Sequence, residues 1–222
     1  MLNRLRIILQ PFGKTSFIHS MTHGAKVLDV GCGNDSAIRL KKMRFDLYYI
    51  GVDIDHQNTG NKEQKTSADE MHITKPENFH QPINDLAGKI DYIISSHNLE
   101  HCIDREKILK AMIKSLKIGG LMYLSFPSMQ SQYFPNRSGP LNYYDEKEHK
   151  DAPPDPEKIQ DILKSMNCQI IYKNLSYQPL LLAFIGLLLE PISRIKNKTL
   201  IGTWQLYGFE SIFWIKKIQP LE

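Results

Sequence analysis

The chain of 222 residues is poor in cysteine, with three cysteines that lie far apart, at Cys32, Cys102 and Cys168. This number and spacing exclude a disulfide framework and a cysteine pair of the kind that binds zinc. The sequence therefore predicts a reduced, cytoplasmic protein, and it predicts no metal site.

No block of lysine and arginine is present, because 28 basic residues are offset by 24 acidic ones for a formal net charge of +4. Nucleic acid is therefore not an expected partner, whereas an anionic substrate or membrane surface is permitted. The sequence gives no indication of the oligomeric state.

A secretory signal is also missing. The N-terminal stretch "MLNRLRIILQPFGK" is interrupted by Arg4 and Arg6, and no small-residue cleavage site follows it. Its apolar residues recur at helical spacing, which predicts an amphipathic helical extension over residues 1–23. This helix either covers one end of the core or contacts a membrane surface.

From residue 26 onward, strand and helix patterns alternate, which is typical of a mostly parallel sheet with helices on both faces. One domain over residues 1–222 is expected. Strands are predicted at 26–30, 47–55, 90–96, 121–127, 169–175 and 209–218, and helices at 36–44, 104–120 and 155–167. The glycines at the end of the second helix are predicted to close it.

The stretch "VLDVGCGNDS" joins a predicted strand to a predicted helix. Gly31 and Gly33 allow a ligand to approach the backbone at the start of the helix, and Asp53 ends the next strand about 20 residues on, where an acid can bind ribose hydroxyls. A third glycine is missing, and Asn34 and Asp35 stand in its place. An acid there would repel a pyrophosphate, so the turn favours an adenosine cofactor without phosphate, namely S-adenosylmethionine.

Five segments in order carry a family resemblance: "VLDVGCGND", "YIGVDID", "TSADEMH", "IDYIISSHNLEHCID" and "LKIGGLMYLSFPS". Over about residues 24–176 the chain resembles the class I S-adenosylmethionine-dependent methyltransferases, in the broad subgroup with "LEH" after the fourth strand. The resemblance implies an α/β fold with a Rossmann-like, doubly wound, seven-stranded sheet of order 3-2-1-4-5-7-6, between two layers of helices. The stretch "FESIFWIKK" suits its closing antiparallel strand.

The resemblance also implies a set of cofactor-binding residues. Asp29 and the glycine turn are expected beside the methionine moiety, Asp53 at the ribose, and the third motif near the adenine, although there the usual acid is shifted by one position or replaced by Ser67. The predicted set is Asp29, Gly31, Cys32, Gly33, Asp53, Ile54, Ser67, Ala68, Asp69, Ser96 and His97. Within it, Cys32 is interpreted as a small buried residue and not as a nucleophile.

Methyl transfer to a hydroxyl requires a group that removes a proton. His97, His101 and His149 are the candidate bases, and the sequence does not decide among them. The stretch "SSHNLEH" stands where many enzymes that methylate nucleobase or amide nitrogens carry an "NPPY"-type motif. The sequence therefore favours O-methylation of a small-molecule, sugar or lipid-linked acceptor, as in surface-polysaccharide pathways.

A long segment without periodicity, residues 128–154, is predicted to be a substrate loop. Aromatic and polar side chains in it suit a polar ring such as a sugar. The predicted acceptor contacts are Tyr133, Arg137, Tyr143, Tyr144 and His149.

A second unusual segment, the apolar insertion at residues 178–200, contains an unbroken apolar run from Leu180 to Leu189. The run is too short to span a bilayer, which needs about 20 apolar residues. It is either a buried helix or a patch that docks on a membrane surface, aided by Arg194, Lys196 and Lys198.

Two other functions remain as alternatives to an active methyltransferase. A non-catalytic methyltransferase-like partner protein is opposed by the intact glycine turn and Asp53. An NAD-dependent oxidoreductase is opposed by Asn34 and Asp35 and by the lack of a Tyr-x-x-x-Lys pair near a plausible catalytic strand.

Overall fold

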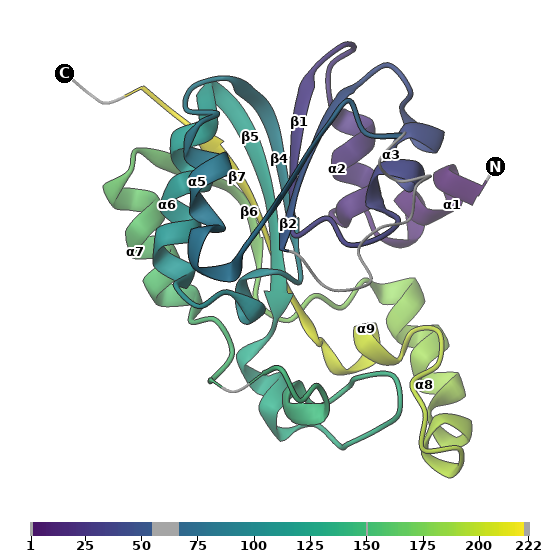
Figure 1. Cartoon of the computed structure of the whole chain (residues 1–222). Coiled ribbons are helices and arrows are strands. Elements are labelled where there is room, and N and C mark those ends of the chain that lie inside the picture. The colour runs from purple at the N-terminus through teal and green to yellow at the C-terminus, as the bar shows by residue number, and fades with distance from the viewer. Residues whose placement is uncertain (1, 55–66, 150, 220–222) are drawn as a thin grey trace.

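A computed structural model describes residues 2–54, 67–149 and 151–219 of the chain (Figure 1). It contains a seven-stranded sheet of order β3-β2-β1-β4-β5-β7-β6. The strands are β1 Lys26–Val30, β2 Tyr48–Ile54, β3 Glu70–Thr74, β4 Ile90–Ser96, β5 Leu116–Pro127, β6 Cys168–Asn174 and β7 Glu210–Lys217. Neighbours among β1 to β5 are parallel, and β7 is antiparallel to both β5 and β6. The predicted fold class is confirmed.

Helices cover both faces of this sheet (Figure 1). The α-helices are α1 Leu2–Leu9, α2 Lys14–Ser20, α3 Ser36–Met43, α5 His80–Asn84, α6 Arg105–Ser115, α7 Pro156–Ser165, α8 Leu180–Ile195 and α9 Thr203–Tyr207. Short 3₁₀ helices are η1 Pro76–Asn78, η2 Leu99–His101, η3 Met129–Tyr133 and η4 Tyr143–Asp145. In Figure 1, α2 and α3 lie on one face and α5, α6 and α7 on the other.

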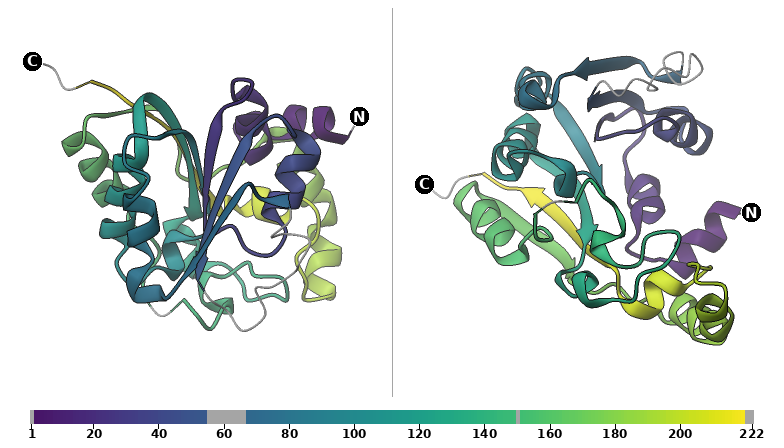
Figure 2. Two further views of the ribbon diagram at one scale, coloured as in Figure 1. Left: turned by 45° about the horizontal axis from the view of Figure 1, so that its top comes forward. Right: turned by 60° about the horizontal axis from the view of Figure 1, so that its bottom comes forward.

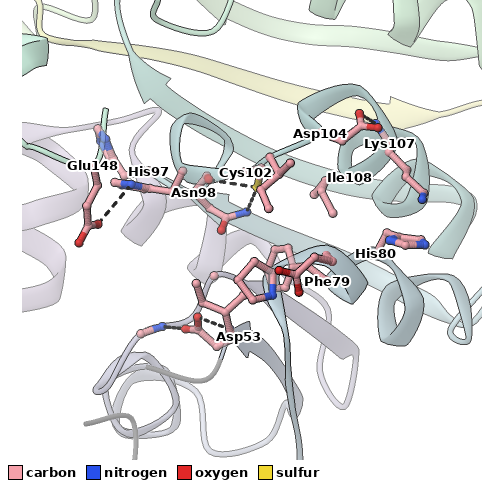
Figure 3. Close-up of a pocket in the computed structure, with 17 residues that line it drawn as sticks. Asp53, Phe79, His80, His97, Asn98, Cys102, Asp104, Lys107, Ile108 and Glu148 are labelled. Atoms are coloured by element: carbon pink, nitrogen blue, oxygen red, sulfur yellow. Dashed lines mark hydrogen bonds and ion pairs between the residues drawn. The ribbon is translucent and has the colours of Figure 1, made fainter. Parts of the chain in front are cut away.

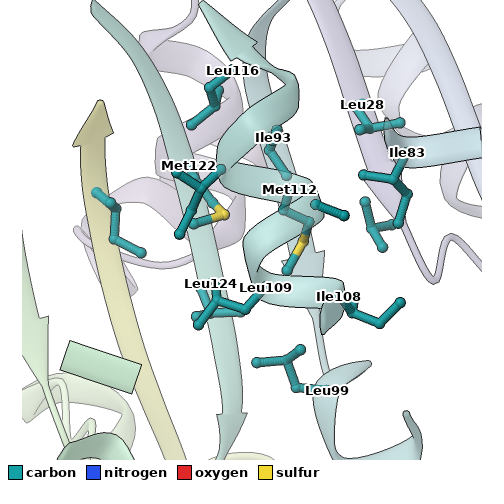
Figure 4. Close-up of a cluster of buried hydrophobic side chains, with 14 of the residues drawn as sticks. Leu28, Ile83, Ile93, Leu99, Ile108, Leu109, Met112, Leu116, Met122 and Leu124 are labelled. Carbon is teal, nitrogen blue, oxygen red and sulfur yellow. The ribbon is translucent and has the colours of Figure 1, made fainter. Parts of the chain in front are cut away.

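Two apolar clusters fill the space between the sheet and its helices. On one face, Leu109 and Met112 of α6 pack against Ile93 of β4 and Met122 of β5 (Figure 4). On the other face, Phe17 of α2 belongs to the second cluster with residues of β1, β2 and β4. Because β1 and β4 are buried on both faces, they read as continuous apolar runs in the sequence.

The carboxyl ends of the parallel strands meet at one edge of the sheet, which the right-hand view of Figure 2 brings forward. The segment that follows β5 and the helices α8 and α9 lie at this edge (Figures 1 and 2). In α/β sheets of this kind, ligands bind outside the carboxyl ends of the strands. The fold thus places the two unusual segments of the sequence beside the expected binding region.

Two predicted helices differ from those observed. The helix predicted over 104–120 ends at Ser115, and residues 116–120 already belong to β5, where Leu116 pairs with Ile90. The N-terminal extension forms two helices, α1 and α2, and Phe12 lies between them with its ring stacked on Tyr172 at 3.8 Å. In the first case pairing with the sheet outweighs local helix propensity, and in the second Pro11 and Gly13 separate the two helices.

None of the helices in the described ranges is long and apolar enough to cross a bilayer.

Candidate active site

The glycine turn after β1 has a backbone that other residues rarely adopt. Gly31 has φ +74° and Gly33 has φ +59°, and the N–H of Gly31 donates to the carbonyl of Val52 at 2.9 Å. A Cβ atom at residue 31 would collide with the side chain of Asn98. The turn therefore requires glycine at residue 31 both for its conformation and for its close contact with the segment after β4.

Asp53, at the end of β2, is held against this turn. Its Oδ2 accepts the N–H of Gly33 at 2.5 Å, and its Oδ1 accepts the N–H of Ile54 at 2.7 Å. The residue is 8% exposed. These two bonds fix the orientation of a carboxylate at the wall of a cavity.

This cavity, which we call the Asp53 cavity, has a volume of about 470 Å³. In Figure 3, Asp53 and Phe79 lie close together, and Glu148 lies on another side of the cavity. The lining residues are Gly31, Gly33, Asp53, Ile54, Pro76, Glu77, Phe79, His80, His97, Asn98, His101, Cys102, Ile103, Asp104, Lys107, Ile108 and Glu148. The cavity thus brings together the glycine turn, the end of β2 and the segments that follow β3 and β4.

A second cavity of about 570 Å³, the Lys14 cavity, lies on the other side of the turn. Gly31 lines both cavities. The other residues that line it are Arg6, Lys14, Thr15, Ile18, Cys32, Asn34, Asp35, Ser36, Arg39, Leu40, Lys42, Met43 and Ser96. The predicted residues Cys32 and Ser96 therefore lie here and not in the Asp53 cavity.

Asp29 lines neither cavity, because its carboxylate is buried beneath the turn. Its Oδ2 accepts the hydroxyl of Ser36 and, at 3.0 Å, the hydroxyl of Tyr49. Lys14 Nζ lies 3.9 Å from the same oxygen. Asp29 thus supports the turn and the start of α3 from below.

Cys32 does not carry a reactive thiol. Burial raises its pKa far above the usual range, and the carboxylates of Asp29 and Asp53 raise it further by opposing a thiolate. The thiol is protonated at neutral pH, in agreement with its interpretation as a small buried residue.

The third motif does not lie where the sequence predicted it. Ser67, Ala68 and Asp69 precede β3, and Asp69 accepts bonds from Lys41 Nζ at 2.5 Å and from the N–H of Tyr49 at 2.6 Å. Tyr49 is near the start of β2, so these residues lie at the amino end of the sheet, away from the Asp53 cavity. The segment that reaches the cavity follows β3 and was not among the predicted site residues.

Among the missed residues, Pro76, Glu77, Phe79 and His80 all line the Asp53 cavity. A proline and an aromatic residue directly after a strand would have been the signal. The strand itself was not recognised, because "EMHIT" has no continuous apolar run.

His97 is not a candidate base. Its Nδ1 lies 3.1 Å from Glu100 Oε1, and its Nε2 lies 3.3 Å from Glu210 Oε1. Burial alone would lower the pKa of the imidazole, but the two carboxylates outweigh it and raise the pKa to about 10. The ring is therefore an imidazolium at neutral pH, and the prediction that it accepts a proton is wrong.

The other two histidines come together although they are far apart in the chain. The Nε2 atoms of His101 and His149 are 3.4 Å apart. His149 is buried, and its Nδ1–H donates to the carbonyl of Tyr143 at 2.6 Å. His101 lines the Asp53 cavity, so it is the histidine that a molecule in the cavity can reach.

The segment 128–154 contains buried anchors as well as exposed aromatic rings. Arg137 is buried and forms a bidentate ion pair with Glu190 of α8, at 2.9 and 2.7 Å. Tyr143 is fully buried, with its ring stacked on that of His149 at 4.3 Å. Both predictions of an acceptor contact are thereby corrected. Tyr133 and Tyr144 remain exposed and available.

The strand order, the glycine turn and the acid at the end of β2 define a class I S-adenosylmethionine-dependent methyltransferase. The chain belongs to the methyltransferase-domain family, whose family model matches residues 9–173. The enzyme is therefore a methyltransferase with S-adenosylmethionine as its cofactor. No curated protein sequence is significantly similar to the chain.

Solved structures support the same fold. An S-adenosylmethionine-dependent methyltransferase from Archaeoglobus fulgidus is 18% identical, with a TM-score of 0.56 over 97% of this chain and 93% of that one. One from Aquifex aeolicus is 13% identical, with a TM-score of 0.57 over 96% and 93%. The phosphoethanolamine N-methyltransferase 2 of Haemonchus contortus, in complex with S-adenosylmethionine, is 18% identical, with a TM-score of 0.57 over 98% of this chain and 53% of that one.

Proposed function

We propose that this enzyme transfers a methyl group from S-adenosylmethionine to a hydroxyl oxygen of a small-molecule, sugar or lipid-linked acceptor. One observation carries the proposal: the Asp53 cavity is lined by Gly31 and Asp53, which suit the cofactor, and also by His101, which can accept a proton. A hydroxyl acceptor needs that proton removed as the new bond to carbon forms.

The cofactor would use both cavities that meet at Gly31. The carboxylate of Asp53 would accept bonds from the ribose hydroxyls, and the apolar side chains of Phe79 and Ile103 would cover the adenine. The amino-acid tail would extend toward the Lys14 cavity, where the ammonium group of Lys14 suits its carboxylate. The cofactor supplies the reactive methyl group, and the protein supplies orientation and exclusion of water.

Around His101 the chain places further acidic groups. Its Nε2 lies 3.8 Å from Glu146 Oε2, and its Nδ1 lies 3.8 Å from Glu148 Oε2. Carboxylates near both ring nitrogens can hold the imidazole in one orientation at the cavity. His101 is therefore our candidate base, with Tyr133 and Tyr144 as candidate contacts of the acceptor.

Two measurements test this function. Calorimetry with S-adenosylmethionine and, separately, with NAD identifies the cofactor. Release of S-adenosylhomocysteine with a panel of phenols, sugars and polyprenyl-linked sugars identifies the acceptor, and mass spectrometry after transfer of a CD₃ group shows which atom carries it. A product labelled on nitrogen would overturn O-methylation, and cofactor binding without turnover of any acceptor would support a non-catalytic partner protein.

We also propose that α8 attaches the enzyme to an anionic membrane surface. The helix exposes a row of large apolar side chains, with Leu180 86% and Phe184 58% exposed. The row, which we call the apolar face of α8, consists of Leu180, Leu181, Phe184, Leu187, Leu188, Ile192 and Ile195. The two interpretations of the sequence were a buried helix and a surface patch, and this exposure supports the surface patch.

The opposite side of α8 explains this orientation. Gly186 allows the backbone of Gly202 to approach so closely that a Cβ atom at residue 186 would collide with it. Glu190 and Ser193 of the same side are buried against Arg137. The small and polar residues of the helix thus face the protein, and the leucines are left outside.

The charge around the apolar face of α8 favours an anionic lipid surface as its partner. Residues 1–20 and 178–207 contain six lysines and arginines and one acid, which is Glu190 in its buried ion pair. Helix α1 contacts α8 and adds the exposed apolar residues Leu5 and Ile8 and the cation Arg6. An apolar face next to cations is typical of a helix that lies in a membrane interface.

A further inference from the structure

We propose that Glu100, His101 and His149 bind one divalent transition-metal ion at the edge of the Asp53 cavity. A nitrogen or oxygen atom from each of these residues lies within 4.8 Å of the other two. The residues come from η2 and from the segment between η4 and α7, which the fold brings together at the carboxyl edge of the sheet. His101 also lines the cavity.

The distance between the two histidines suits a shared ion. Zinc binds imidazole nitrogen at about 2.0–2.1 Å in tetrahedral geometry, which places two ligand nitrogens about 3.3–3.4 Å apart. The Nε2 atoms of His101 and His149 are 3.4 Å apart. The two rings thus already have the separation that coordination requires.

Glu100 is a buried carboxylate that lacks a partner for one of its oxygens. The residue is 4% exposed, its Oε1 faces the ring of His97, and its Oε2 has no hydrogen-bond partner. A buried polar atom without a partner is costly and calls for an unseen ion or water. A cation bound by this oxygen and by the two histidines would supply the missing partner.

The surroundings of His149 are those of a metal ligand. Its Nδ1–H donates to the backbone carbonyl of Tyr143, which leaves the lone pair of Nε2 directed toward His101. Metal-binding histidines usually donate their second N–H in this way, which fixes the tautomer and the ring. Glu146 Oε2, at 3.6 Å from His149 Nε2 and 3.8 Å from His101 Nε2, can supply a further ligand.

The ligand set selects the kind of ion and its use. Two imidazoles with carboxylates favour zinc, cobalt or iron over magnesium and calcium. An ion at this edge would bind an acceptor hydroxyl and lower its pKa, so that the alkoxide or phenolate forms near neutral pH. This role, unlike the binding of the ion, rests on the proposed O-methylation. With the ion bound, His101 would be a ligand, and the ion would replace it in activating the hydroxyl; without the ion, His101 remains the candidate base. The role favours acceptors with two adjacent hydroxyls that can chelate the ion.

Metal binding is tested on the full chain without an affinity tag, after treatment with a chelator and removal of that chelator. We expect calorimetry with Zn²⁺ to show one site per chain, and Co²⁺ to give the visible absorption of a tetrahedral or five-coordinate ion with nitrogen ligands. His149→Gln and Glu100→Gln should each weaken Zn²⁺ binding at least tenfold. His23→Ala is the matched control, because His23 is exposed and remote from the cluster, and it should bind as the parent does.

Two results would overturn the site: a parent protein that binds neither ion at micromolar concentrations, or equal binding by the parent and both cluster variants. The second result would show that other surface groups hold the ion. S-adenosylmethionine is titrated into the same metal-free sample to keep the two proposals apart. Binding of S-adenosylmethionine without binding of a metal ion would disprove the metal site and would leave the proposed methyltransferase function standing.

Discussion

The guanidinium of Arg137 and the carboxylate of Glu190 form a buried bidentate ion pair that joins the segment after β5 to helix α8. Arg137 also donates to the hydroxyl of Ser193 at 2.6 Å, and Tyr207 donates to Glu190 Oε1 at 2.6 Å. The pair explains why an arginine in a predicted substrate loop is unavailable to a substrate. It also holds α8 with its apolar face outward.

Arg137→Ala should destabilise the protein by about 3 kcal/mol, because it leaves the buried carboxylate of Glu190 without its main partner. Urea unfolding measures the loss. The double variant Arg137→Met/Glu190→Leu should recover most of it, since no buried charge then remains unpaired. If Arg137→Ala instead lost affinity for the acceptor and kept its stability, Arg137 would be a contact of the acceptor.

The same pair predicts a dependence of stability on pH. Arg137 lowers the pKa of Glu190 in the folded protein from the ordinary 4.5 to about 2. The carboxylate therefore contributes its full stabilisation above pH 4.5 and loses it as the pH falls toward 2. The difference in unfolding free energy between the parent and Glu190→Gln should be larger at pH 7 than at pH 3.5. A difference that is the same at both values would show that the charge of Glu190 does not matter.

The sequence predicted those parts of the site that depend on local pattern. A glycine turn between a strand and a helix and an acid at the end of the next strand are contiguous features, and the structure places Gly31, Gly33 and Asp53 at one cavity. Strands buried on both faces are also visible as apolar runs, so β1, β2, β4 and β5 could be predicted. The order of the strands came from the family resemblance.

The rest depends on contacts between distant segments. The ion pairs of His97 with Glu210 and of Arg137 with Glu190 join residues more than 50 positions apart, so no local sequence pattern predicts them. The third motif failed for a different reason: β3 is half-buried and short, so the strand was not predicted, and the position of Ser67, Ala68 and Asp69 before it could not be seen. His149 was named as a base, but its pairing with His101 comes from the fold alone.

Gly31→Ala should abolish cofactor binding, because a Cβ atom there would collide with Asn98 and displace the wall shared by the two cavities. Gly24→Ala is the matched control: Gly24 has a similar φ of +70° but open space around it. Both variants carry backbone strain of about 1–2 kcal/mol, and only the first carries the collision. Calorimetry with S-adenosylmethionine on folded protein should separate them, and equal binding by both would place the cofactor elsewhere.

Asp53→Asn should weaken binding of S-adenosylmethionine about 10- to 150-fold, since a hydrogen bond to a charged acceptor contributes about 1.5–3 kcal/mol. The amide keeps the size of the side chain but can accept only one of the two N–H groups of Gly33 and Ile54. Thermal unfolding is therefore measured beside the affinity, to separate a disturbed turn from a lost ribose contact. Asp161→Asn, at an exposed position on α7, removes the same charge far from the cavity. We expect that control to bind as the parent does. An unchanged affinity of Asp53→Asn for S-adenosylmethionine would show that this carboxylate does not bind the ribose.

The apolar face of α8 should bind vesicles that contain anionic lipid. In flotation at low salt, we expect the parent protein to rise with phosphatidylglycerol-containing vesicles and to stay behind with purely zwitterionic ones. Added salt should weaken binding, because each lysine or arginine near the surface contributes about 1 kcal/mol that ions screen.

Leu181→Ser/Leu188→Ser should abolish flotation, because both leucines are more than half exposed on the apolar face of α8 and their loss does not disturb the core. Phe45→Ser/Ile118→Ser is the matched control, because both residues are also exposed. Phe45 follows α3 and Ile118 lies near the start of β5, so both are at the amino end of the sheet, away from α8. This control should float as the parent does. Light scattering of the same samples tests whether a second copy of the chain covers this face instead. In that case the parent would be dimeric and would not float, and the variant without the two leucines would be monomeric. This outcome would make the face an interface between two copies of the chain.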